Sequence, residues 1–482
     1  MKRYPWLEEI HIPLTAPQCF ELFKDRTFSF FLDSGMDPGK LGRYSFMGSD
    51  PFLVLQSRGR DISLSYGNGE WKSIKGDPFD VLNELLKLYS LDANPADIPL
   101  VGGAIGYFSY DLCHFIERLP STAVDDLGLP ECYLAFYDTI VAFDHLTQKT
   151  YLVANGFPEL EEKKRKQQAE EKLEATRIKL LNSPLHPSTT GALATAGIGQ
   201  DIALKSNFTQ EEYLKAVAAA REYILAGDIF QVNLSQRFEA DLLIPPYELY
   251  RQLRRINPAP FASYLGFDKV SVVSASPERF LRIKGDCIQT RPIKGTRPRG
   301  KTAAEDEALA QELLASIKDR AENVMIVDLE RNDLGRICRY GTVKVTELAI
   351  LETYPTVFHL ASTVNGKLWP GRNRIDLLRS TFPGGSITGA PKVRSMEIID
   401  ELEPTRRSVY TGAIGYLSFS NEMDLNIAIR TFIIKDGRAY FQVGGGIVYD
   451  SKPEAEYEET MDKAGALIQA LDLSTQVTME TK

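Results

Sequence analysis

The pentapeptide Gly103-Ala-Ile-Gly-Tyr107 recurs in the second half of the chain as Gly412-Ala-Ile-Gly-Tyr416. Each copy leads into a short aromatic-rich stretch with the residue types that favour β-strands. A match of five residues can also arise by chance. Otherwise the repeat predicts two related β-units that form one paired core and do not fold as independent domains.

The surrounding sequence predicts an α+β fold, with two β-sheet-based halves packed together and helices around them. Apolar runs at 324–329 and 425–434 have the composition of strands and alternate with helical stretches. No Gly-x-Gly-x-x-Gly follows a strand, which disfavours a doubly wound dinucleotide-binding fold. We divide the chain into an N-terminal strand-rich domain at 1–155, a charged helix and linker at 156–204, and a catalytic domain at 205–475.

The composition argues against several classes of protein. The 482 residues carry a formal net charge of −9, from 56 Lys and Arg against 65 Asp and Glu, which disfavours nucleic-acid binding. There is neither a signal peptide nor an apolar run of the ~18 residues that a membrane helix needs, so we expect no membrane segment and a cytoplasmic location. The cysteines are scattered and never in Cys-x-x-Cys spacing, which argues against disulfides and zinc and fits a reducing compartment.

Lys294 stands in the run Arg291-Pro-Ile-Lys-Gly-Thr-Arg297. A free lysine has a pKa near ~10.4 and is a poor nucleophile until that pKa falls. Burial disfavours the charged form, and so do neighbouring cations, here Arg291, Arg297 and Arg299. The residues alone leave open whether Lys294 is a nucleophile or part of a solvated basic loop. Earlier in the chain, Glu278 follows a proline in a short turn and is a second candidate for chemistry.

Two pairs of carboxylates have helical spacing. Asp319 and Glu322 lie three residues apart, as do Glu456 and Glu459, so on a helix each pair shares one face, and Lys463 lies one turn beyond the second pair. Neither pair is accompanied by His or Cys, so an all-oxygen site would suit Mg²⁺ better than zinc. Each pair taken alone is better explained as ordinary surface charge, whereas two pairs in one chain favour a metal site.

Glycine-rich segments supply a third signal. The loop from Phe382 to Lys392, which includes Thr388, ends in Pro391 at the start of a predicted helix, where free amides can hold a carboxylate or phosphate. A second cluster, Gly444-Gly445-Gly446, permits close backbone approach to an anion, although tight turns explain such runs equally well. His359 lies in an apolar stretch and is either a core residue or part of a site.

Several segments together resemble the chorismate-utilising enzyme family. The resemblance is strong from about 205 to 475 and weaker before 150. It rests on these segments: Gln231-Val-Asn-Leu-Ser, Ser276-Pro-Glu-Arg-Phe, Lys318-Asp-Arg-Ala-Glu-Asn, Arg331-Asn-Asp-Leu-Gly-Arg, the glycine-rich loop from Phe382 to Lys392, Tyr410-Thr-Gly-Ala-Ile-Gly-Tyr, Asp424-Leu-Asn-Ile-Ala-Ile-Arg-Thr and the stretch from Glu456 to Lys463. It implies a chorismate-binding-enzyme core. Within the family, aminodeoxychorismate synthases have Pro-Ile-Lys-Gly-Thr, whereas anthranilate synthases have alanine in place of the lysine. Some isochorismate and salicylate synthases also carry a lysine in this region, and theirs activates water.

The resemblance to aminodeoxychorismate synthases implies a mechanism. Lys294 would add to C2 of chorismate while the C4 hydroxyl leaves, ammonia would then add at C4, and Glu278 would be the general acid and base. Mg²⁺ would be held by Glu322 and Glu459, with Asp319 and Glu456 acting through water. The remaining site residues would bind substrate carboxylates or line the ring pocket: Thr388, Tyr410, Arg430, the amides of Gly444, Gly445 and Gly446, Lys463, and His359 as part of the catalytic set.

The resemblance also implies partners. Ammonia would come from glutamine through a separate amidotransferase subunit, and the product would serve 4-aminobenzoate and folate synthesis. A tryptophan pocket, regulatory or structural, would be built from Ser34, Arg43, Tyr44, Pro260 and Phe261. Two alternatives stay open at this point: the large component of anthranilate synthase, and a tryptophan-binding regulatory subunit without catalysis.

Overall fold

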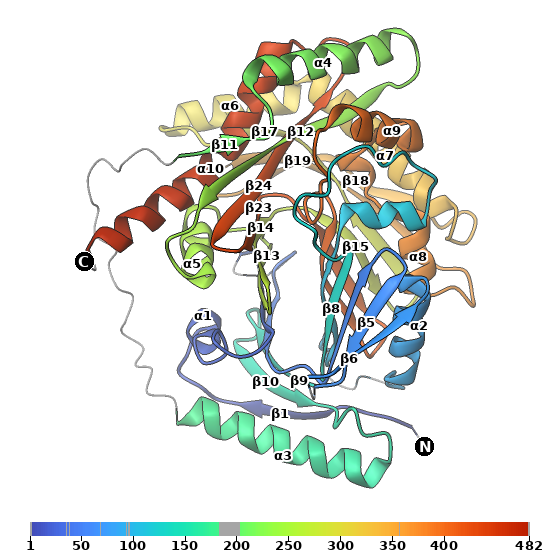
Figure 1. Cartoon of the computed structure of the whole chain (residues 1–482), viewed down its shortest axis with the longest axis vertical. Helices are drawn as coiled ribbons and strands as arrows, with labels where there is room; N and C mark the ends of the chain where they lie inside the picture. The colour runs from blue at the N-terminus through green and yellow to red at the C-terminus, as the bar shows by residue number, and fades with distance from the viewer. Residues whose placement is uncertain are drawn as a thin grey trace.

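A computed structural model of the chain describes residues 2–34, 36–37, 39–67, 69–92, 94, 97–182, 203–355 and 357–480, with side chains as far as Asp472. Most of the predicted linker lies outside these residues. Within them, the strands form two antiparallel sheets that pack against each other (Figure 1). The main hydrophobic core fills the space between the sheets and contains Phe30 and Leu265 from the first and Tyr107 and Ile414 from the second. The predicted α+β class, with two sheet-based halves and surrounding helices, is confirmed.

The first sheet mixes strands from both ends of the chain. In order of pairing, its strands are β1 (Trp6–Ile10), β10 (Lys149–Ala154), β9 (Thr139–Asp144), β3 (Tyr44–Gly48), β2 (Ser29–Asp33), β13 (Phe261–Phe267), β14 (Val270–Ser276), β23 (Thr431–Lys435), β24 (Arg438–Ile447), β12 (Gln231–Asp241) and β11 (Lys205–Ser206), with β20 (Gly389–Ala390) also on β12. The N-terminal and C-terminal strands meet where β2 pairs with β13.

The second sheet is mixed in the same way. Its order is β17 (Ile293–Pro298), β19 (Val357–Lys367), β16 (Cys287–Arg291), β15 (Arg279–Lys284), β22 (Met423–Ile427), β21 (Ala413–Ser418), β7 (Gly103–Phe108), β8 (Cys132–Tyr137), β4 (Leu53–Arg58), β5 (Asp61–Ser65) and β6 (Trp71–Lys75), with β18 (Lys344–Thr353) also on β19. Here the two halves of the chain meet where β7 pairs with β21.

The repeated pentapeptide forms that junction. Strands β7 and β21 pair antiparallel, with Gly106 opposite Gly415 and Tyr107 opposite Ile414. A Cβ atom at Gly106 would lie 2.0 Å from the carbonyl oxygen of Tyr133, and one at Gly415 would lie 2.1 Å from that of Asp424. The glycines are therefore required because neighbouring strands approach too closely for a side chain. The prediction of one paired core from the repeat is confirmed.

Helices cover the outer faces and ends of the sheets (Figure 1). They are α1 (Ala16–Phe20), α2 (Pro78–Leu88), α3 (Glu162–Leu181), α4 (Gln210–Leu225), α5 (Pro246–Ile256), α6 (Ala303–Ala315), α7 (Ile317–Gly335), α8 (Arg374–Thr381), α9 (Lys392–Leu402) and α10 (Pro453–Glu480), with short 3₁₀ helices η1 (Tyr110–Phe115) and η2 (Gly385–Ile387). Helix α3 is the predicted charged helix. Helix α10 packs on β24 of the first sheet, and α7 packs on β17 and β19 of the second.

One apolar run was assigned to the wrong kind of element. Residues 324–329 were predicted to resemble a strand, but they lie inside α7. Their buried members Ile326 and Val327 continue at helical spacing to Glu330 and Leu334, and this face packs against β19. A short apolar run cannot distinguish a strand from a buried helix segment, since periodicity becomes visible only over a longer window. No helix in the described part of the chain is long and apolar enough to cross a membrane.

Candidate active site

Lys294 and Glu278 meet through one residue of the Gly384 loop (residues 384–388). Lys294 lies on β17, and Glu278 lies in the turn between β14 and β15. The Lys294 Nζ donates to the carbonyl oxygen of Ser386 at 3.0 Å, while the Ser386 hydroxyl donates to Glu278 Oε1 at 2.6 Å. Ser386 thus holds the candidate nucleophile with one oxygen and the candidate acid with the other. It was missed in the sequence, where the loop was recognised but only Thr388 was singled out.

Both side chains have perturbed acidities. Burial raises the pKa of Glu278 to about 7, although the Ser386 hydroxyl and the Lys294 ammonium act in the opposite direction. Burial also lowers the pKa of Lys294 from its ordinary value, against the opposing influence of Glu322 and Glu278. An acid with a pKa near neutrality beside a destabilised ammonium is the arrangement that general acid catalysis and an amine nucleophile require.

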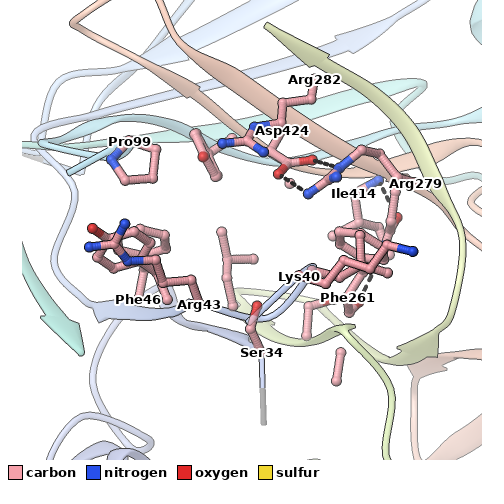
Figure 2. Close-up of a pocket in the computed structure, with 18 of the residues that line it drawn as sticks. Ser34, Lys40, Arg43, Phe46, Pro99, Phe261, Arg279, Arg282, Ile414 and Asp424 are labelled. Atoms are coloured by element: carbon pink, nitrogen blue, oxygen red, sulfur yellow. Dashed lines mark hydrogen bonds and ion pairs between the residues drawn. The ribbon is translucent and has the colours of Figure 1, made fainter. Parts of the chain in front are cut away.

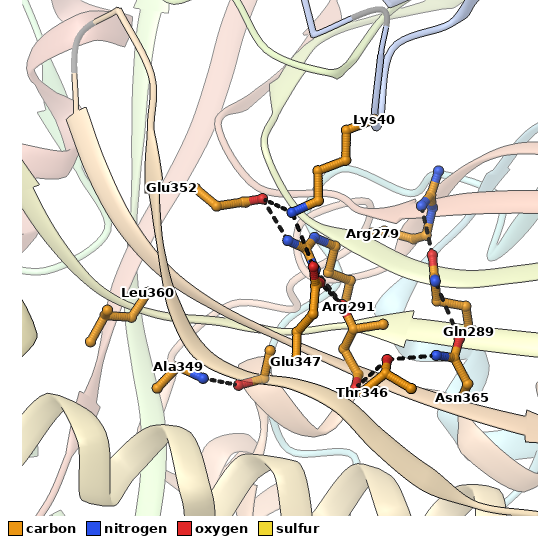
Figure 3. A network of polar contacts seen from close by, with 12 residues as sticks. Lys40, Arg279, Gln289, Arg291, Thr346, Glu347, Ala349, Glu352, Leu360 and Asn365 are labelled. Atoms are coloured by element: carbon orange, nitrogen blue, oxygen red, sulfur yellow. Dashed lines mark hydrogen bonds and ion pairs between the residues drawn. The ribbon is translucent and has the colours of Figure 1, made fainter.

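The arginines around Lys294 do not cause its shift, contrary to the expectation from sequence. Arg291 is paired with Glu347 and Glu352, in a network that also includes Lys40 (Figure 3). The charges of the other two are likewise neutralised, because Arg297 pairs with Glu312 and Asp319, and Arg299 with Asp306. The cation that does lower the pKa of Lys294 is Lys463, which lies on α10, far from Lys294 in sequence. Its effect is smaller than that of burial.

The four predicted metal ligands lie on two helices near Lys294. Asp319 and Glu322 belong to α7, and Glu456 and Glu459 to α10. Glu322 and Glu459 act electrostatically on each other and on Lys294, which places the two helices around one space. Within the described residues no three carboxylate, His or Cys side chains converge closely enough to form a metal centre.

Glu456 has a carboxylate oxygen that could be a ligand for a cation. Its Oε1 accepts from the Ser451 hydroxyl at 2.6 Å, whereas its buried Oε2 has no hydrogen-bond partner. A Cβ atom at Gly445 would lie 3.2 Å from this Oε2 and 3.5 Å from Glu459 Oε1. Lys463 partly neutralises the same region, since its Nζ lies 2.7 Å from Glu459 Oε1. The donor set is therefore all oxygen, negatively charged and incompletely satisfied, which fits a hard divalent cation.

His359 is a neutral, buried ring beside the lysine strand. Its Nδ1 lies 2.8 Å from the Thr296 hydroxyl, and its ring packs edge-on against Tyr354. Burial, with a contribution from the Arg430 guanidinium, lowers the pKa of His359 to about 4. The imidazole is therefore uncharged near neutral pH, so that it can contribute a hydrogen bond or a packing surface but no positive charge.

Arg430 lies near His359, whereas the charged groups near Tyr410 are Arg407 and Glu403. Burial lowers the pKa of Arg430, and its guanidinium makes no ion pair among the described residues. Its φ of 52° is a left-handed backbone conformation, which is uncommon for a residue with a side chain and frequent at functional sites. Tyr410 is buried, and burial raises the pKa of its hydroxyl. Arg430 is half-buried, and a partly desolvated guanidinium without an ion pair is suited to binding an anion.

The predicted glycine and threonine positions have structural explanations as well. Gly444, Gly445 and Gly446 lie inside β24 and pair with β12, so they do not form a turn. Lys463 Nζ donates to the carbonyl oxygen of Gly444 at 2.8 Å. The Thr388 hydroxyl donates to the carbonyl oxygen of Gly384 at 3.0 Å, and so it supports the loop that carries Ser386.

The sequence matches the family model described as chorismate binding enzyme over residues 45–469. The chain belongs to the chorismate-binding enzymes. It is 40% identical to anthranilate synthase component 1 of Acetivibrio thermocellus, over 97% of this chain and 95% of that one. It is also 40% identical to aminodeoxychorismate synthase component 1 of Bacillus subtilis, over 92% of each.

A solved structure shares the fold. Anthranilate synthase component I from Streptococcus pneumoniae superimposes with a TM-score of 0.76 at 32% sequence identity, covering 96% of this chain and 99% of that one. This chorismate-utilising enzyme is thus similar both to proteins named anthranilate synthase and to proteins named aminodeoxychorismate synthase.

The chorismate-binding enzyme also has a cavity of about 250 Å³ between its sheets, away from Lys294. Ser34, Arg43, Tyr44 and Phe261 line it, and the Ser34 hydroxyl donates to the carbonyl oxygen of Pro260 at 3.1 Å, so the residues predicted for a tryptophan pocket lie together. Figure 2 shows Ser34 and Arg43 facing the opposite wall, where Arg279 pairs with Asp424, which also lines the cavity.

Proposed function

We propose that this enzyme is the large component of aminodeoxychorismate synthase, which converts chorismate and ammonia to 4-amino-4-deoxychorismate for 4-aminobenzoate and folate synthesis. The observation that carries the proposal is the environment of Lys294. It lies on β17, burial lowers its pKa, and Ser386 links it to Glu278, whose pKa lies near neutrality. The Bacillus subtilis relative named aminodeoxychorismate synthase component 1 supports this choice.

The reaction has two displacements. The neutral amine of Lys294 forms a bond to C2 of chorismate, the ring double bonds shift, and the C4–O bond breaks as Glu278 gives its proton to the departing hydroxyl, which leaves as water. Ammonia then forms a bond to C4, the double bonds shift back, and the C2–N bond to Lys294 breaks. Covalent catalysis replaces one difficult displacement with two easier ones.

Substrate carboxylates are bound by cations that lack a full complement of partners. Arg430 makes no ion pair within the described residues, and Lys463 shares its charge between Glu459 and a backbone oxygen. Tyr410 and neutral His359 enclose the ring, so the water-poor space strengthens each charge interaction within it. Gly444 to Gly446 lie near the C-terminal end of β24, and those of their amides that do not pair with β12 would contribute further donors.

Mg²⁺ fits the acidic groups on α7 and α10. Glu322 and Glu459 would hold the ion directly, and Asp319 and Glu456 would do so through water; the unsatisfied Oε2 of Glu456 supports this assignment. When bound, the ion would neutralise a substrate carboxylate and act as a Lewis acid. Among the described residues no three of these side chains converge, so water and substrate oxygens would complete the coordination of the ion.

Two partners belong to the proposal. Ammonia would be delivered by a separate glutamine amidotransferase subunit, and tryptophan would occupy the cavity between the sheets, where a carboxylate could meet Arg43 and an indole could meet Tyr44 and Phe261. Both assignments follow the family resemblance and the chemistry of the lining residues.

Anthranilate synthase component 1 is the second candidate, because the Acetivibrio thermocellus relative of that name is equally identical to this chain. The two reactions differ in product. Purified enzyme is incubated with chorismate, Mg²⁺ and ammonium, and the products are separated by chromatography and identified by mass spectrometry. We expect 4-amino-4-deoxychorismate. Fluorescent anthranilate would support the second candidate, and isochorismate or salicylate would exclude both.

A further inference from the structure

A buried charged cluster that the proposed reaction does not use lies beneath the Gly384 loop. Glu330 and Asp333 come from α7, and Lys392 begins α9. The Lys392 ammonium pairs with Asp333 and also donates to the carbonyl oxygens of Pro383 at 2.8 Å and Thr381 at 2.9 Å. The cluster therefore contacts the segment that leads into the loop.

Glu330 holds the loop itself. The Gly385 N–H donates to Glu330 Oε1 at 3.0 Å, and the Thr290 hydroxyl donates to Glu330 Oε2 at 3.3 Å. The fit is tight, because a Cβ atom at Gly385 would lie 3.0 Å from Glu330 Oε1 and 2.8 Å from Leu329 Cδ2. Gly385 immediately precedes Ser386, so this hydrogen bond helps to fix the peptide from which Ser386 reaches both Lys294 and Glu278.

We propose that Glu330 is a positioning residue that places Ser386, and through it the Glu278–Lys294 pair, for reaction. The inference rests on the proposed function in using Glu278 as the proton donor. It also gives α7 a double role, since the same rigid helix carries Glu322 near one end and the loop anchor Glu330 near the other. Burying a carboxylate costs free energy, and the hydrogen bond from the Gly385 amide explains why a carboxylate occupies position 330.

The charged groups that face Glu330 are Asp333, Lys392 and Glu278. Burial, followed by the charge of Asp333, raises the pKa of Glu330 to about 7. Either protonation state leaves an oxygen that accepts from Gly385, so a neutral amide of the same shape should serve almost as well. A methyl group cannot accept this hydrogen bond.

The test compares Glu330→Ala with Glu330→Gln, and uses Asp328→Ala as a matched control, because Asp328 lies on the same helix with its carboxylate exposed. Steady-state rates of chorismate consumption are measured from pH 5.5 to 9. We expect Glu330→Ala to lower kcat roughly 10- to 100-fold, with KM for chorismate within about threefold, because small misplacements of reacting groups have effects of this size. Glu330→Gln should stay within about threefold of the wild type, and Asp328→Ala within about twofold.

The pH profile separates positioning from mere support of the fold. The Ser386 hydroxyl lowers the pKa of Glu278. When Ser386 is misplaced, that pKa rises, so the decline of kcat at high pH should move to higher pH in Glu330→Ala but not in Glu330→Gln. An unchanged kcat and profile in Glu330→Ala would overturn the proposal, as would a loss in Glu330→Gln as large as in Glu330→Ala.

A second variant covers the case in which Glu330→Ala does not fold. Gly385→Ala disturbs the same contact from the loop side and should lower kcat with the same change of profile; wild-type turnover would again contradict the proposal. Chorismate consumption is followed regardless of the product formed. If these results hold and the product is anthranilate, the positioning role stands and only the assigned reaction fails.

Discussion

The Lys294 site and the cavity between the sheets differ in how their positive charges are paired. In the cavity most of the cations are paired, as Arg43 is with Asp144 and Arg279 with Asp424, and only Arg282 has no ion pair among the described residues. Around Lys294 the ammonium makes no ion pair among the described residues, and its pKa falls because the nearby carboxylates only partly offset burial. The cavity is therefore suited to holding a ligand, and the chemistry belongs at Lys294, where desolvation is only partly compensated.

The largest effect is expected from Lys294→Ala. The variant removes the nucleophile, so formation of 4-amino-4-deoxychorismate from chorismate and ammonium should fall at least ~10³-fold. Product is quantified by mass spectrometry, with Lys301→Ala as the control, because Lys301 is exposed in the neighbouring loop. Retention of more than a tenth of the wild-type rate would mean that Lys294 is not the nucleophile.

Glu278→Gln should follow, with a loss of roughly 10²- to 10⁴-fold in kcat, because it removes the proton donor. In the wild type the required acid form is lost as pH rises through about 7, so kcat should decline above that pH. As pH falls through the pKa of Lys294, kcat should also fall, because the amine takes up a proton. A wild-type profile without the decline above pH 7 would be inconsistent with this assignment.

The same substitution should stabilise the fold at alkaline pH. The folded pKa of Glu278 is raised from 4.5 to about 7, so folding favours the protonated form, and stability declines as pH rises between these values and stays reduced above them. Glutamine carries no charge, so Glu278→Gln should gain about 2–3 kcal/mol in the free energy of unfolding at pH 8, with a smaller gain near pH 5. Chemical denaturation at the two pH values measures this, and Asp328→Asn, at an exposed carboxylate, should show no such gain.

The smallest effect is expected in the cavity. Arg43 is half-exposed and pairs with Asp144, so Arg43→Ala should change stability by about 1 kcal/mol or less and kcat by no more than about twofold. Steady-state kinetics at saturating chorismate checks this. A tenfold fall in kcat would show that the cavity and the Lys294 site act as one unit and that the contrast between them is wrong.

The sequence predicted the elements whose causes are local. The repeated pentapeptide and the helical spacing of the carboxylate pairs are both visible in the sequence, so both could be recognised without a structure. The source of the shifted pKa of Lys294 could not, because side chains from distant segments neutralise the arginines beside it in sequence, as Glu352 does for Arg291.

Ser386 was missed for a related reason. Its contacts join residues far apart in the chain, Lys294 and Glu278, and nothing in the loop sequence shows which of its oxygens face them. Glu330 gave no signal either, because a glutamate on a helix is usually exposed, and its burial against Gly385 depends on how the loop folds over α7.

The central claim is that Lys294 bonds to chorismate, and intact-mass analysis tests it most directly. Enzyme is mixed with chorismate and Mg²⁺ without ammonia, quenched at short intervals and analysed whole and after digestion. We expect a mass gain of one chorismate less one water, located on the peptide that contains Lys294 and absent in Lys294→Ala. A protein that stays unmodified at every interval, together with wild-type product formation by Lys294→Ala when ammonium is added, would contradict the claim.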